Sequence, residues 1–65
     1  MTAQDQIKVL NAGFMILRRD YFRLKIKCKT KDFPEWRTLE KDFASKAEID
    51  RRMTDLLKRK KVIED

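Results

Sequence analysis

The sequence contains no histidine, and it has one cysteine, one glycine and one proline among 65 residues. The absence of histidine removes the commonest general base and metal ligand. A single cysteine excludes an internal disulfide and, without histidine, cannot supply a tetrahedral metal site. No glycine-rich phosphate loop is present either. We therefore predict that the chain is not an enzyme, holds no metal or cofactor, and takes no small-molecule substrate.

Long hydrophobic runs are also lacking. The longest mostly apolar stretch, Val9–Leu17, is interrupted by Asn11 and Gly13 and has about half the length that a bilayer requires. Residues 1–6 are polar and aperiodic, so we expect a disordered N-terminus followed by one small domain over residues 7–65. A free thiol fits the interior of a cell, and we expect a cytoplasmic protein without a membrane partner.

Positive charge, by contrast, is abundant and concentrated in one segment. Residues 18–31 contain seven of the 17 basic residues and a single acid, and their net charge of +6 equals that of the whole chain. The rest of the chain is therefore neutral overall. A local surplus of this kind is typical of a surface that meets an anionic partner.

Residues that favour sheets predict a strand at residues 14–18, and alternating side chains predict two more at residues 22–30 and 36–43. The three strands are expected to form an antiparallel sheet. The second strand alternates without a fault, which puts its apolar side chains on one face and its cations on the other. The apolar set is Phe22, Leu24, Ile26 and Cys28, and the cationic set is Arg23, Lys25, Lys27 and Lys29. The third strand does not reveal which of its faces is buried, and residues 7–10 fit either a short strand or an extension of the first.

A helix is predicted after the strands. Ser45 and Glu48 match a capping box at its start, and Ile49, Met53, Leu56 and Leu57 form one apolar stripe. The expected fold is therefore α+β, with a small three-stranded antiparallel sheet packed against one C-terminal helix in the order β-β-β-α. Cys28, on the apolar face of the second strand, is expected to be an inert core residue.

The row of cations is the main candidate site. Alternate side chains on a strand lie roughly 6.6 Å apart, which is close to the spacing of phosphates along a nucleic-acid strand. Solubilising residues would mix charges of both signs, whereas this row contains no acid. The proposed nucleic-acid-binding residues are Arg23, Lys25, Lys27, Lys29, Arg37, Arg18 and Arg19.

Several other candidate binding residues have both a functional and a structural interpretation. Arg37 could bind a phosphate or a guanine, or could form an ion pair with Glu35 or Glu40. Trp36, Tyr21 and Phe33 could stack on bases or serve the fold. The run Lys58–Lys61 resembles a polyanion or nuclear-localisation motif, although cations at a helix C-terminus are also expected from the helix dipole.

The order of elements resembles a known class of DNA-binding domain. A basic central strand, the pair Trp36-Arg37, and Phe43-Ala44-Ser45-Lys46-Ala47-Glu48 at the helix start are similar to the arm-binding domains of tyrosine integrases and to AP2 domains. The resemblance implies a sheet that enters the major groove and a helix that braces it from behind. The resemblance covers residues 22–57, and the chain lacks the hairpin glycines of that class. It also resembles short reading frames of mobile elements in gut bacteria, which implies an accessory role.

Two functions remain open at this point. The first is a non-catalytic domain that binds nucleic acid, duplex DNA in the first place, through the basic sheet face. The alternative is a protein-interaction or assembly module, which could be a homodimer. Residues 14–17 favour the alternative because they alternate poorly, so that some of them need either exposure or a partner.

Overall fold

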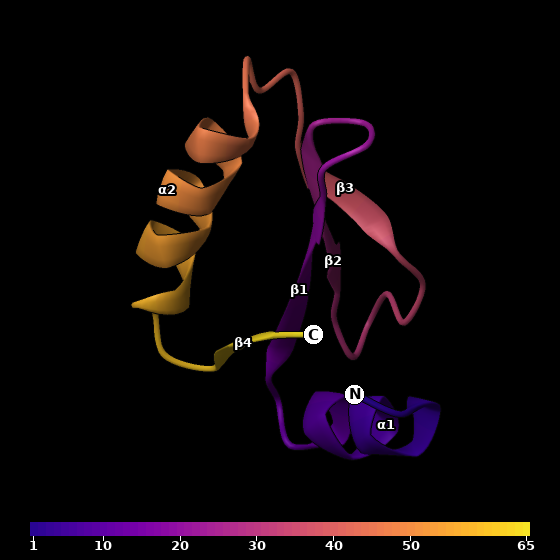
Figure 1. Ribbon diagram of the computed structural model, residues 1–65. Coiled ribbons are helices and arrows are strands. Elements are labelled where there is room, and N and C mark those ends of the chain that lie inside the picture. The colour runs from indigo at the N-terminus through magenta and orange to yellow at the C-terminus, as the bar shows by residue number, and fades with distance from the viewer.

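The computed structural model describes residues 1–65, and its apolar residues bring a mixed sheet and two helices together (Figure 1). The elements, in chain order, are α1 (Ala3–Asn11), β1 (Met15–Asp20), β2 (Lys25–Lys29), β3 (Arg37–Glu40), α2 (Lys46–Leu57) and β4 (Val62–Glu64). The predicted α+β class is confirmed. The predicted order β-β-β-α is incomplete, because a helix precedes it and a fourth strand follows it.

The sheet has the strand order β3-β2-β1-β4. β1 and β2 form an antiparallel hairpin, β3 pairs antiparallel with β2, and β4 pairs parallel with β1. In Figure 1, α2 stands along one side of the sheet, while α1 lies at the end of the sheet opposite to the hairpin turn. The helix α2 thus carries the chain from the β3 edge to the β4 edge across one face.

The main core lies between that face and α2. It contains Leu17, Ile26 and Cys28 from the inner strands and Ile49, Met53 and Leu56 from the helix. The predicted helical stripe is confirmed, with Leu57 half-buried at its margin. Cys28 is a free, buried cysteine, and burial raises the pKa of its thiol.

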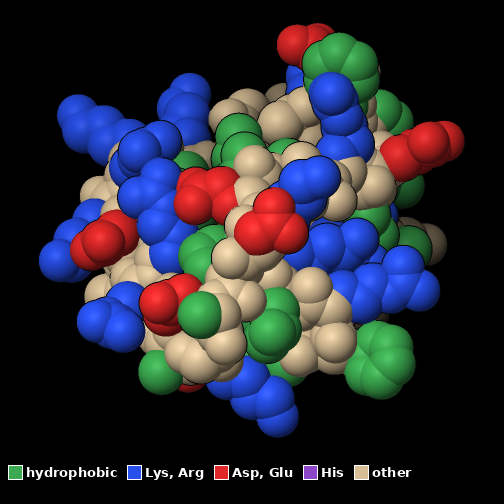
Figure 2. Space-filling view, turned by 90° about the horizontal axis from the view of Figure 1, so that it is seen from above, with side chains coloured by type: hydrophobic (Ala, Val, Ile, Leu, Met, Phe, Trp, Pro, Cys, Tyr) green, Lys and Arg blue, Asp and Glu red, His purple; other side chains and the backbone are tan.

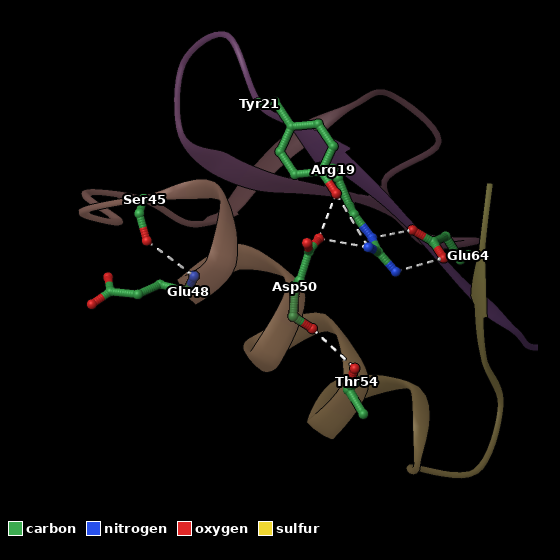
Figure 3. Close-up of polar contacts among 7 residues, drawn as sticks. All are labelled: Arg19, Tyr21, Ser45, Glu48, Asp50, Thr54 and Glu64. Carbon is green, nitrogen blue, oxygen red and sulfur yellow. Dashed lines mark hydrogen bonds and ion pairs between the residues drawn. The ribbon is translucent and has the colours of Figure 1, made fainter.

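The start of α2 follows the predicted capping pattern (Figure 3). The Ser45 hydroxyl accepts a hydrogen bond from the Glu48 amide at 3.3 Å, and the Glu48 carboxylate accepts one from the Ala44 amide at 2.8 Å. In the usual box the carboxylate binds the amide of the capping residue itself, so the pattern here is shifted by one residue. Both bonds satisfy donors that the helix cannot satisfy internally.

A helix, α1, replaces the disordered end predicted for residues 1–6 and the short strand considered for residues 7–10. The Thr2 hydroxyl caps it by accepting from the Asp5 amide at 3.1 Å. Gly13 closes it with φ +92°, and the amides of Gly13 and Phe14 donate back to carbonyls of the last turn. These two bonds form a Schellman motif, in which glycine readily takes the left-handed position.

The face of the sheet opposite α2 receives α1. Ile16 is fully buried there, beside the buried Leu10 and Gln6 of the helix. Its neighbour Leu17 is fully buried on the α2 side. Residues 14–17 therefore alternate poorly because each face of β1 is covered by a different helix of the same chain.

The second strand is shorter than predicted. Residues 21–24 form the hairpin turn, so Phe22 is 92% exposed and does not belong to the apolar face. Arg23 also lies in this turn rather than on the strand. The prediction was wrong at these two positions because a perfect alternation in sequence continues past the last paired residue.

Ile26 should contribute strongly to stability, since its side chain is fully buried in the main core. We expect Ile26→Ala to lower the free energy of unfolding by about 2–4 kcal/mol, as other buried aliphatic truncations do. A domain of this size has little stability to lose. Thermal melting followed by circular dichroism should show a largely unfolded protein at 37 °C. The partly exposed Leu39 of β3 is the control, and equal melting of Ile26→Ala and Leu39→Ala would contradict this assignment of the core.

Candidate nucleic-acid interface

Three lysines of β2 share the sheet face opposite α2. Lys25, Lys27 and Lys29 alternate with the buried Ile26 and Cys28, whose side chains enter the main core. Pairing places Arg18 of β1 directly across from Lys27, on the same face. Four of the seven predicted residues are therefore brought together, and we call Arg18, Lys25, Lys27 and Lys29 the cationic face.

Two carboxylates reduce the charge of the cationic face. Asp20 lies 3.4 Å from the Lys27 ammonium, and Asp65 accepts a hydrogen bond at 2.9 Å from the Nε of Arg18. Four cations and two anions leave a surplus of two positive charges. No sequence pattern placed Asp65 beside these cations, because β4 was not predicted.

Trp36 forms part of the same surface. The Arg18 guanidinium lies 4.2 Å and the Lys29 ammonium 4.7 Å from the centre of its half-buried ring. Contacts of this kind are attractive because the face of an indole ring is electronegative. The Lys29 ammonium also donates to Gln6 of α1 at 2.9 Å. These contacts hold two of the four cations in place beside an aromatic ring.

Arg19 is not part of the cationic face. It points to the α2 side, where its guanidinium donates to Asp50 at 2.6 Å and to Glu64 at 2.5 Å (Figure 3). It also contacts the Tyr21 hydroxyl, and these partners together raise its pKa above the ordinary arginine value. Adjacent residues of a strand face opposite sides, so the sequence already contained the signal that separates Arg18 from Arg19.

The two remaining predicted residues lie outside the cationic face. The Arg23 amide donates to Asp20 at 3.0 Å, and its side chain is exposed at the hairpin turn. The Arg37 guanidinium stacks 4.1 Å from the centre of the Phe33 ring. Neither Glu35 nor Glu40 pairs with Arg37; Glu40 instead binds Arg52 at 2.8 Å.

The basic run after α2 meets a different part of the molecule. Lys60 and Lys61 line a hollow of about 410 Å³ together with Lys31 and the segment that follows α1. Within the run, Lys58 approaches a carboxylate, Asp55, at 4.0 Å. This second basic region is exposed, and Phe14 lines the same hollow.

Comparison with protein-family models, with curated proteins and with solved structures gives no match. Neither α1 nor α2 has the length and apolar character of a membrane-spanning helix. No group of three acidic or cysteine side chains is arranged to hold a metal ion.

Three carboxylates make the stability of the fold depend on pH in the acidic range. The backbone hydrogen bond from Arg23 lowers the pKa of Asp20, the Tyr21 hydroxyl lowers that of Asp50, and Arg18 lowers that of Asp65. A group whose folded pKa is depressed stabilises the fold above its unfolded pKa of about 3.9 and loses that effect as the pH falls through its folded value. We expect the melting temperature to be steady from neutral pH to about pH 5 and to fall below about pH 4. A melting temperature that stays constant or rises between about pH 4 and 2 would contradict these contacts.

Proposed function

We propose that this chain is a non-catalytic nucleic-acid-binding domain, with duplex DNA as the first expected ligand, and that the cationic face is its contact surface. The observation that carries the proposal is the gathering of Arg18, Lys25, Lys27 and Lys29 on the sheet face that α2 leaves uncovered. Phosphates of the nucleic acid would lie along the cationic face, next to these side chains. Most protein–DNA contacts are of this sequence-independent kind, and they fix position rather than specificity.

The layout of charge supports the proposal. The lysines lie on one short strand at a regular interval, and their neighbour across the hairpin is an arginine that rests on Trp36. A guanidinium held against a ring loses less conformational freedom when it binds a phosphate. Lys25 has no carboxylate within ion-pair distance, so it is free to meet an anion.

Residues 14–17 no longer favour the alternative function, an assembly module. Poor alternation in residues 14–17 suggested apolar side chains that needed a partner. Ile16 and Leu17 are instead fully buried within one chain, and Phe14 and Met15 are half-buried. The cationic face itself offers a protein partner little exposed apolar area, and interface cores are depleted in lysine.

A charge-removal experiment locates the site. The triple variant Lys25→Gln, Lys27→Gln, Lys29→Gln should lose most of its affinity for random duplex DNA, measured by fluorescence anisotropy. The wild type should show a slope of log K against log salt of about −2, at about −0.9 for each of the two surplus charges of the cationic face. The triple variant should have a slope close to zero.

The matched control removes the same charge elsewhere, through Lys58→Gln, Lys60→Gln and Lys61→Gln. Circular dichroism should show both triple variants folded, because none of the six side chains belongs to the main core. A larger loss of affinity in the control than in the strand variant would show that the site lies at the basic run. Absence of binding to duplex, single strand and RNA at low salt would remove the proposed function.

Removal of the negative charge of Asp20 should increase the affinity for duplex DNA. Asp20→Asn keeps an oxygen that can accept from the Arg23 amide but removes the negative charge beside Lys27. Releasing one ion pair adds one effective cation, so affinity at 0.1 M salt should rise by about eightfold, from −0.9 per charge on a logarithmic scale. Asp55→Asn on the exposed side of α2 is the control with the same change in net charge, and equal gains in both variants would contradict the location of the site.

A further inference from the structure

Phe22 is the most exposed large apolar side chain of the molecule. Its exposed fraction is 92%, against 58% for Ile7 and 54% for Phe33. It lies at the tip of the β1–β2 hairpin, in the turn of residues 21–24. An aromatic ring in this position contributes nothing to the core and is accessible to a partner.

The turn around Phe22 is firmly held. Asp20 accepts from the Arg23 amide at 3.0 Å, and the Tyr21 hydroxyl hydrogen-bonds to Asp50 of α2 (Figure 3). Leu24 adopts φ +50°, a conformation that is uncommon for leucine, and its side chain packs against the main core. Phe22 is thus presented outward by a turn whose flanking residues are anchored to the body of the protein.

Cations surround this tip. Arg23 follows Phe22 directly and is exposed, Lys25 begins the cationic face two residues later, and the Lys46 ammonium lies 5.7 Å from the centre of the Tyr21 ring. Figure 2 views the molecule from the end where the hairpin turns, and lysine and arginine side chains project over much of its outline. The exposed ring therefore has cations beside it, while Asp20 and Asp50 are the carboxylates bound at the same turn.

We propose that Phe22 is a base-stacking contact, which packs its ring against the π-face of a nucleobase at the hairpin end of the cationic face. This inference rests on the proposed function and adds a partner group to it. Stacking of a base on an aromatic side chain tolerates any sequence and, from alanine substitutions, changes affinity by roughly 5- to 150-fold. The test below distinguishes two sources of this base: an unpaired nucleotide, and a duplex step that the ring opens as a wedge.

A lipid surface is a less suitable partner for this tip. Interfacial binding increases with the apolar area that enters the membrane, and one ring supplies little of it. The neighbours of Phe22 do not add to that area, since Tyr21 is tied to α2, Arg23 is charged and Leu24 packs inward. A single exposed ring beside a phosphate track is better matched to stacking on a single base.

The test compares Phe22→Ala with Phe33→Ala, the latter being the next most exposed phenylalanine, on a different turn. Affinity would be measured for an intact duplex and for a single strand, at about 50 and 200 mM salt. We expect Phe22→Ala to weaken binding by the same factor, roughly 5- to 150-fold, at both salt concentrations, because stacking displaces no counterions. Phe33→Ala should bind more tightly than Phe22→Ala, and both variants should melt as cooperatively as the wild type.

Replacements that differ in π-character separate stacking from simple apolar contact. Phe22→Trp should bind at least as tightly as the wild type, whereas Phe22→Leu should lose nearly as much affinity as Phe22→Ala. A larger loss on the single strand would identify an unpaired base as the partner. An equal loss on the intact duplex, with a change in the fluorescence of 2-aminopurine placed in it, would identify an opened base step.

Four outcomes would overturn the inference. If Phe22→Ala binds like the wild type while the triple lysine variant of β2 does not, binding through the cationic face is supported and stacking by Phe22 is excluded. If Phe22→Leu retains full affinity, or if Phe22→Ala affects only binding to anionic vesicles, the ring is not a base contact. If the wild type binds no nucleic acid at all, the proposed function and the stacking contact fail together.

Discussion

The apolar contact between α2 and the β1–β2 hairpin is the interaction on which the rest of the structure depends. Leu17 and Ile26 meet Ile49 and Met53 there, and all four side chains are fully buried. A chain of 65 residues has room for one core of this size. Once α2 occupies one face of the sheet, side chains at the alternate positions must be satisfied on the other face, by α1, by ion pairs or by a ligand.

Division of the sheet into two faces also divides the basic segment. Arg18 and Arg19 are adjacent in sequence, yet Arg18 joins the cationic face while Arg19 is bound by Asp50 and Glu64 on the α2 side. The surplus of charge concentrated in residues 18–31 is therefore not one surface. Part of it stabilises the contact between sheet and helix, and part remains available on the open face, where Asp20 and Asp65 limit it.

Helices and strands with a repeated pattern of apolar side chains could be predicted from the sequence. Elements whose apolar pattern is weak or too short could not. α2 combines a capping pair with a stripe of four apolar residues, and β2 alternates over its whole length. α1 has two inward-facing residues, Gln6 and Leu10, of which one is polar, so its periodicity is weak. Its caps at Thr2 and Gly13 were the usable signal. β4 has three residues, which is too short for any periodicity.

The sequence by itself determined the α+β class, the position of α2, and the face of β2 on which three lysines lie, because side-chain period is a local property of the backbone. Tertiary structure decided how many of those charges stay free. Asp20 reaches Lys27 across the hairpin, and Asp65 reaches Arg18 only because β4 returns beside β1. Tertiary structure also decided that Phe22 is exposed, since the register of β1 and β2 fixes where pairing ends. Contacts between residues distant in sequence follow from packing, which no local pattern specifies.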